Sequence, residues 1–161
     1  MTRPFLIRLA AIMLFLPVFY VGSTLLSRAV TTEVVVVDPT TGVAIYGFDP
    51  VMFFIEQNAV KGQPDFEVEW EGAHWQFTSA ANAARFADAP AIYAPRFNGY
   101  GAFAISQGRI AEGNPLIWAI YENQLYFFHS ANARARWARD VSANVEAAKV
   151  KWTEIYEKLA R

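Results

Sequence analysis

The sequence predicts an α+β domain built from two similar strand–hairpin–strand–helix units, followed by a long helical segment and preceded by one transmembrane helix. Three observations predict this arrangement: an uncharged apolar segment at residues 9–26, an internal repeat at an offset of 51 residues, and an apolar stripe at helical spacing near the C-terminus. We therefore divide the chain of 161 residues into a leading segment, 1–30, and a globular domain, 31–161, with units at about 43–97 and 98–161.

The leading segment is predicted to be a membrane anchor. Leu9–Leu26 carries no charge, and at 1.5 Å per residue it spans about 27 Å as a helix, enough for the hydrocarbon core of a bilayer. Arg3 and Arg8 precede it, and basic flanks stay on the cytoplasmic side. We expect a single-pass signal-anchor in a bacterial inner membrane, with the globular domain in the periplasm. The alternative is a signal peptide cleaved near Ala29, which would release the domain into the periplasm.

Composition limits the classes of function. Apolar residues make up 54% of the chain and aromatic residues 16%, which predicts a packed, aromatic core. Three of the 14 basic residues lie in or beside the leading segment, so the globular domain is acidic, and this argues against a nucleic-acid partner. The chain has no cysteine, which excludes disulfides, thiolate metal sites, iron–sulfur clusters and thiol nucleophiles.

The internal repeat predicts two β-hairpins. Residues 68–80, VEWEGAHWQFTSA, align without a gap with residues 119–131, AIYENQLYFFHSA. Gly72 and Asn123 occupy the same place in the two copies, and both residue types tolerate the positive φ that a tight hairpin turn requires. Alternating aromatic residues follow each turn, as expected for a half-buried strand.

Each hairpin is predicted to lead into a helix. Ser79 and Ser130 are suited to cap these helices by accepting hydrogen bonds from the first turn. Phe86 and Trp137, two turns further on, are expected to hold each helix against its hairpin. After Trp137, apolar residues recur every three or four positions to Leu159, which predicts a long helical segment that Asp140 and Ser142 could divide.

Further motifs make residues 43–156 resemble the YHS-domain proteins. They are Tyr46-Gly47-Phe48-Asp49-Pro50-Val51, Val60-Lys61-Gly62, Gly72-Ala73-His74-Trp75-Gln76-Phe77, Ser79, Phe86, Pro90, Tyr93-Ala94-Pro95, Asn98-Gly99-Tyr100-Gly101-Ala102, Pro115-Leu116-Ile117-Trp118 and Leu125-Tyr126. The resemblance implies the α+β fold described above and, in metal-binding members, a soft-metal site built on cysteine.

This chain departs from the family at the thiol positions. Metal-binding members resemble Phe-Cys-Ser-x-x-Cys at the strand-to-helix junction, where this chain has Thr78 and Asn82 in place of the cysteines. The branch most similar to this chain has cysteine or selenocysteine after Gly-Tyr, where this chain has Gly101. Neither soft-metal binding nor thiol redox chemistry therefore carries over from the resemblance.

A ligand-binding site is predicted around the glycine-tyrosine segment between the two units. Its glycines allow backbone to approach a ligand closely, and Tyr46, Tyr100, Gly101 and His129 are expected to converge there. His129 lies where metal-binding relatives have a cysteine, and its position on the strand face of Leu125 and Phe127 predicts that it is covered. It is a candidate metal ligand, and the alternative is a core histidine whose hydrogen bonds are satisfied.

A second candidate metal site is predicted on the outer face of the first hairpin. Alternation places His74, Glu67 and Glu69 on the same face, and these nitrogen and oxygen ligands suit a divalent or copper ion. The alternative is a polar sheet face with an ordinary cross-strand Glu–His pair. The candidate metal ligands are thus His129, His74 and Glu69, with Glu67 beside them.

The function predicted from these features is a membrane-anchored, periplasm-facing binding or accessory module without thiol chemistry. Its expected partners are the lipid bilayer, through residues 9–26, and a membrane protein complex. The alternative is a periplasmic metal-handling protein for copper, zinc or iron with histidine and glutamate ligands. An enzyme is least favoured, because the chain has no phosphate-binding loop and no recognisable nucleophile motif beside a histidine.

Overall fold

The computed structural model describes residues 33–161, which lie in one compact unit, Thr31–Arg161. The predicted transmembrane helix at 9–26 and the alternative cleavage near Ala29 fall outside the described residues. Within 33–161, no helix combines the length and the apolar character needed to cross a bilayer. The structure therefore describes the globular domain alone.

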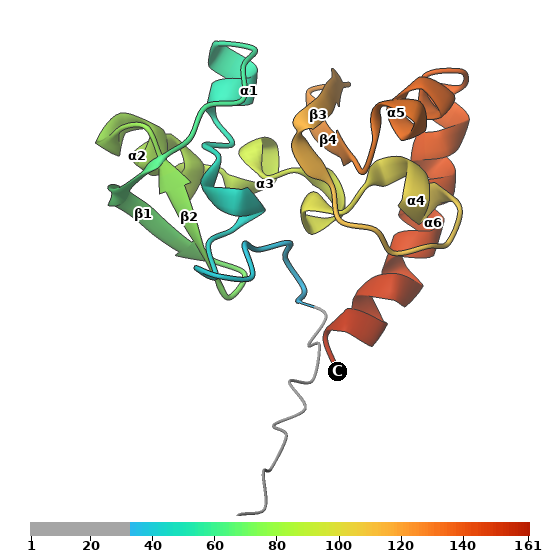
Figure 1. The fold of residues 1–161 in the computed structure, drawn as a ribbon, viewed down its shortest axis with the longest axis horizontal. Helices are drawn as coiled ribbons and strands as arrows, with labels where there is room; N and C mark the ends of the chain where they lie inside the picture. Colours follow the sequence, from blue (N-terminus) through green and yellow to red (C-terminus); the bar gives the residue numbers. More distant parts are fainter. Residues whose placement is uncertain (1–32) are drawn as a thin grey trace, which may run out of the picture. The chain divides into compact units, whose positions relative to one another are not determined.

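The domain has a mixed α+β architecture, as predicted, with two antiparallel hairpins and several helices (Figure 1). In chain order the elements are η1 (Ile45–Gly47), α1 (Met52–Ile55), β1 (Gln63–Trp70), β2 (Ala73–Phe77), α2 (Ala80–Asp88), α3 (Pro90–Tyr93), η2 (Arg96–Gly99), α4 (Ala102–Ser106), β3 (Asn114–Tyr121), β4 (Gln124–Phe128), α5 (Ala131–Trp137) and α6 (Val141–Leu159). Here η denotes a short 3₁₀ helix.

The two hairpins share one register, which confirms the internal repeat. Gln63 of β1 pairs with Phe77 of β2, and Asn114 of β3 pairs with Phe128 of β4, each pair 51 residues from its counterpart. Both ladders are irregular at the same place, after Gln63 in one and after Asn114 in the other. The turns behave as expected from composition, because Gly72 and Asn123 adopt φ of 73° and 55°.

The predicted caps and anchoring residues are also confirmed. The Ser79 side chain accepts a hydrogen bond from the Asn82 N–H at 3.2 Å, and Ser130 accepts one from the Ala133 N–H at 3.2 Å. The Phe86 ring lies 5.1 Å from the Trp75 ring, and the Trp137 ring lies 5.1 Å from the Phe128 ring. The C-terminal segment is divided as its sequence suggests, since α5 ends at Trp137 and Asp140 caps α6.

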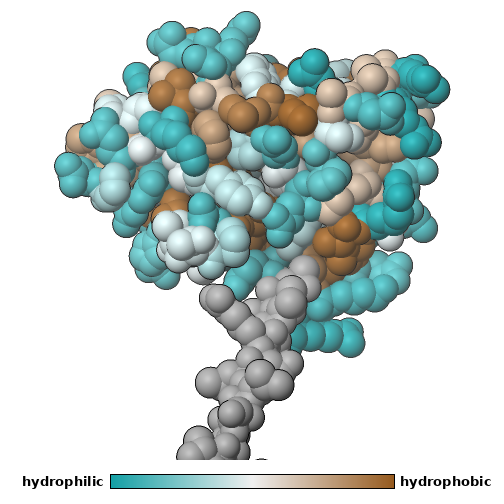
Figure 2. All heavy atoms as spheres, viewed as in Figure 1, coloured by the Kyte–Doolittle hydropathy of each residue, from teal (hydrophilic) through white to brown (hydrophobic). Residues whose placement is uncertain are grey.

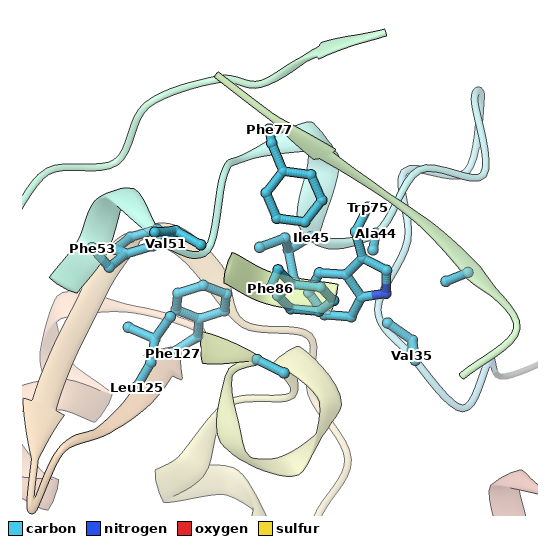
Figure 3. Packing of buried hydrophobic residues seen from close by; sticks show 12 residues of the cluster. Val35, Ala44, Ile45, Val51, Phe53, Trp75, Phe77, Phe86, Leu125 and Phe127 are labelled. Atoms are coloured by element: carbon cyan, nitrogen blue, oxygen red, sulfur yellow. The ribbon is translucent and has the colours of Figure 1, made fainter. Parts of the chain in front are cut away.

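Strand β4 is buried on both faces and joins the two units. Leu125 and Phe127 pack into the core of the first unit, beside residues such as Phe53 and Phe86 (Figure 3). Tyr126 and Phe128 point the other way, into a second core formed with α4, α5 and α6. On the face shown in Figure 2, hydrophilic residues cover most of the surface and hydrophobic residues form smaller patches between them.

Candidate functional site

Two cavities share His129 in their walls. The smaller, of about 250 Å³, is formed by α4, the segment after it, and α5; its lining residues include Phe103, Arg109, His129, Asn132, Ala133 and Arg136. The larger, of about 500 Å³, is formed by η1, the segment before β1, and the first residues of β3 with the segment before them; its lining residues include Tyr46, Phe48, Lys61, Glu112, Leu116 and His129. These cavities are the candidate functional site.

Glu112 organises the polar side of the larger cavity. The Tyr46 hydroxyl donates to the Glu112 carboxylate at 2.5 Å, and this hydrogen bond raises the pKa of Tyr46 to about 12. His129 Nδ1 lies 3.2 Å from the Glu112 carbonyl oxygen, which can only accept a hydrogen bond. The contact therefore favours the tautomer with the proton on Nδ1, and Nε2 makes no hydrogen bond within residues 33–161.

Backbone geometry brings Tyr46 and Lys61 to the same cavity. Ile45, Tyr46 and Gly47 adopt φ of 44°, 58° and 74°, a turn of a kind that non-glycine residues rarely adopt. This turn exposes the Tyr46 carbonyl oxygen, which accepts a hydrogen bond from Lys61 Nζ. The Lys61 ammonium also lies 4.2 Å from the centre of the Phe48 ring, a cation–π contact. One wall of the cavity thus combines a cation with an aromatic surface.

The four predicted ligand-binding residues do not converge on one pocket. Tyr46 and His129 both line the larger cavity, but Tyr100 and Gly101 line neither cavity. Tyr100 is buried, its hydroxyl donates to the Glu33 carbonyl oxygen at 2.5 Å, and burial raises its pKa to about 12. Gly101 is buried with its backbone against His129.

The expectation that His129 is covered is wrong. Leu125 and Phe127 are fully buried as predicted, but His129 itself is exposed. The reason is that β4 ends at Phe128, so His129 lies beyond the strand and the alternation no longer determines its surroundings. This correction makes His129 accessible from both cavities.

A buried hydrogen-bond network surrounds Asp49 and was not predicted from the sequence. The Asp49 side chain is fully buried and accepts four hydrogen bonds, each of 2.8 Å. The donors are the Val51 N–H, the Thr78 N–H and hydroxyl, and the Asn82 side-chain amide. Thr78 and Asn82 occupy the thiol positions of the resemblance, so in this chain those positions serve to hold a carboxylate. The feature of the sequence that could have predicted this network is Asp49 itself, an acidic residue inside an otherwise apolar segment.

The predicted metal ligands lie apart. His74 faces Glu67 across the first hairpin, with Nδ1 and the carboxylate 3.9 Å apart, and Glu69 pairs with His74 in the strand register. His129 belongs to the other hairpin unit. Within residues 33–161, no group of three or more histidine, aspartate or glutamate side chains is arranged to hold a metal ion. Metal binding stays a prediction from the sequence.

Comparisons with protein-family models, with curated proteins and with solved structures found no match to this chain. The site is therefore interpreted from its own geometry. Its chemistry is that of binding: a cation beside an aromatic ring in the larger cavity, two arginines in the smaller one, and a histidine between them.

Proposed function

We propose that this protein is a membrane-anchored binding module of the YHS type that lacks thiol chemistry and docks on a membrane protein in the bacterial inner membrane. Residues 9–26 serve as the anchor, and the globular domain lies in the periplasm. The absence of cysteine and the use of Thr78 and Asn82 to hold the Asp49 side chain support a role other than soft-metal chemistry.

The larger cavity is the observation that carries the docking proposal. Its apolar surface comes from Phe48, Pro115 and Leu116, and the Leu116 side chain is 64% exposed. Its polar edge comes from Lys61 on one unit and Glu112 on the other. An apolar centre with a charged edge is the usual composition of a protein-binding surface. The matching partner segment presents an apolar side chain with an acidic residue placed to contact Lys61.

The test is co-purification of the full chain from membranes solubilised in mild detergent. We expect a membrane protein to co-purify with the native chain and to be lost with Leu116→Asp, since a carboxylate would then have to be buried in the apolar centre. Ile92→Asp is the matched control, because Ile92 is 51% exposed on α3 and does not line the cavity.

Both variants should keep the native melting temperature, because exposed positions tolerate substitution. A native chain that purifies as a clean monomer without a partner would refute the docking proposal. Equal loss of the partner in Leu116→Asp and Ile92→Asp would show that docking does not use the larger cavity.

A further inference from the structure

The internal repeat extends upstream of the hairpins, to the segments that contain η1 and η2. The Gly62 N–H donates to the Gly47 carbonyl oxygen at 2.9 Å, and the Gly113 N–H donates to the Gly99 carbonyl oxygen at 3.0 Å. Two residues further along the chain, the same correspondence appears again in two hydrogen bonds of 2.8 Å. The Asp49 N–H donates to the Val60 carbonyl oxygen, and the Gly101 N–H donates to the Ala111 carbonyl oxygen. Gly101 is therefore the structural counterpart of Asp49.

The two units differ where this correspondence meets the helices. Three residues of the buried network have different residue types at the equivalent positions of the second unit. Gly101 replaces Asp49, His129 replaces Thr78, and Ala133 replaces Asn82. The replacements at 101 and 133 each remove a polar side chain. The fourth pair, Arg85 with Arg136, keeps its guanidinium. The second unit has thus lost a carboxylate and an amide but has kept the positive charge beside them.

The smaller cavity borders the region of these replacements, although Gly101 itself does not line it. A Cβ atom on Gly101 would lie 3.1 Å from the His129 backbone nitrogen and 3.4 Å from the Ala111 carbonyl oxygen. A side chain at this position would therefore lie beside the His129 N–H, the counterpart of the Thr78 N–H that donates to Asp49. His129 and Ala133 both line the cavity. Because His129 lies beyond the end of β4 and makes no backbone hydrogen bond among the described residues, its N–H is available to an acceptor.

The cavity carries two positive charges without internal compensation. Arg109 and Arg136 both line it, and neither forms a salt bridge with any carboxylate in residues 33–161. The Arg136 guanidinium is positioned by the Phe103 ring, whose centre lies 4.8 Å away. In the first unit the corresponding arginine, Arg85, is already engaged by Asn82 at 3.0 Å.

We propose that this cavity binds the carboxylate of a small organic acid, next to the position that corresponds to Asp49 in the first unit. The His129 N–H and the guanidinium of Arg136 would donate to it, and Arg109 would supply the second charge. Charge-assisted hydrogen bonds of this kind are about twice as strong as neutral ones. A cavity of about 250 Å³ suits a short acid rather than a large metabolite. The proposal does not depend on the docking surface, which lies in the other cavity.

The test is a titration of the full chain, isotopically labelled and held in a nonionic detergent micelle, with acetate and succinate. Backbone amide NMR spectra give the readout. We expect saturable shifts of the His129 and Ala133 amides. Arg136→Gln should weaken binding about tenfold or more, as for loss of a charged hydrogen-bond partner. Arg139→Gln is the matched control, because it removes the same charge from a residue that does not line the cavity, and its affinity should stay within about twofold.

A second variant keeps the test decisive if Arg136→Gln perturbs the fold. Gly101→Asp restores the internal carboxylate, and φ of −66° at this position accepts a side chain, although the His129 nitrogen must give way slightly. We expect it to abolish the acetate shifts while the rest of the spectrum is retained. Absence of saturable shifts with both acids, an unchanged affinity in Arg136→Gln, or tighter binding of inorganic phosphate than of acetate would each overturn the proposal.

Discussion

Replacement of Asp49 by alanine tests whether the buried network stabilises the fold. The substitution removes the acceptor of four hydrogen bonds of 2.8 Å. The Asn82 amide still reaches the Thr78 hydroxyl at 3.1 Å, but the backbone N–H groups of Val51 and Thr78 lose their acceptors. Each buried donor left without a partner costs about 1–3 kcal/mol. Relief from burying the carboxyl group offsets part of this, so we expect a loss of about 3 kcal/mol in unfolding free energy.

The assay is urea-induced unfolding of the full chain in nonionic detergent, followed by tryptophan fluorescence. Asp65→Ala is the matched control, since Asp65 is an exposed acid on β1, and its unfolding free energy should change by less than about 0.5 kcal/mol. Asp49→Asn keeps one acceptor oxygen but turns an amide toward the donors, so it should fall between the native chain and Asp49→Ala. A loss below about 1 kcal/mol in Asp49→Ala would refute the argument that this network is a main stabilising feature of the first unit.

Two further predictions follow from single side chains. Because the Glu112 contact raises the pKa of Tyr46 to about 12, above the ordinary value near 10, the folded state holds this proton longer, so its contribution to stability is complete below about pH 10 and is lost toward pH 12. Unfolding free energy should therefore fall less steeply over this range in Tyr46→Phe than in the native chain, and equal slopes would contradict the assignment. The buried Trp137 Nε1 has no acceptor among the described residues, whereas Trp75 Nε1 donates to a carbonyl at 3.0 Å. In thermal unfolding, Trp137→Phe should cost less than about 1 kcal/mol and Trp75→Phe about 2 kcal/mol, and the reverse order would refute this explanation.

Local features of the fold were predictable from the sequence because each depends on a few neighbouring residues. A turn residue such as Gly72, a capping residue such as Ser79 and an aromatic residue two turns into a helix act within about ten positions of each other. Each feature occurs a second time at an offset of 51, so the two copies predict the same local structure independently. The break before α6 was predictable for the same reason, since Asp140 is a capping residue type inside an apolar stripe.

The candidate site was less predictable because its contacts join distant segments. Asp49 meets Thr78 and Asn82 across 29 and 33 residues, and Tyr46 meets Glu112 across 66 residues. The match between Asp49 and Gly101 was hidden for another reason. It lies at an offset of 52 rather than 51, because the segment that leads into the first hairpin is one residue longer than its counterpart. An ungapped comparison therefore places Gly101 beside the wrong residue.

The two units assign the same position to different tasks. In the first unit a carboxyl group of the chain itself satisfies the donors, which stabilises the fold and leaves no space for a ligand. In the second unit glycine and alanine leave the His129 N–H and the arginine accessible, which forgoes stability at a site that can then bind. The two experiments on these positions therefore bear on each other. If Asp49 contributes little to stability, the donors around it are weak, and the same weakness should appear as a low affinity for acetate at His129.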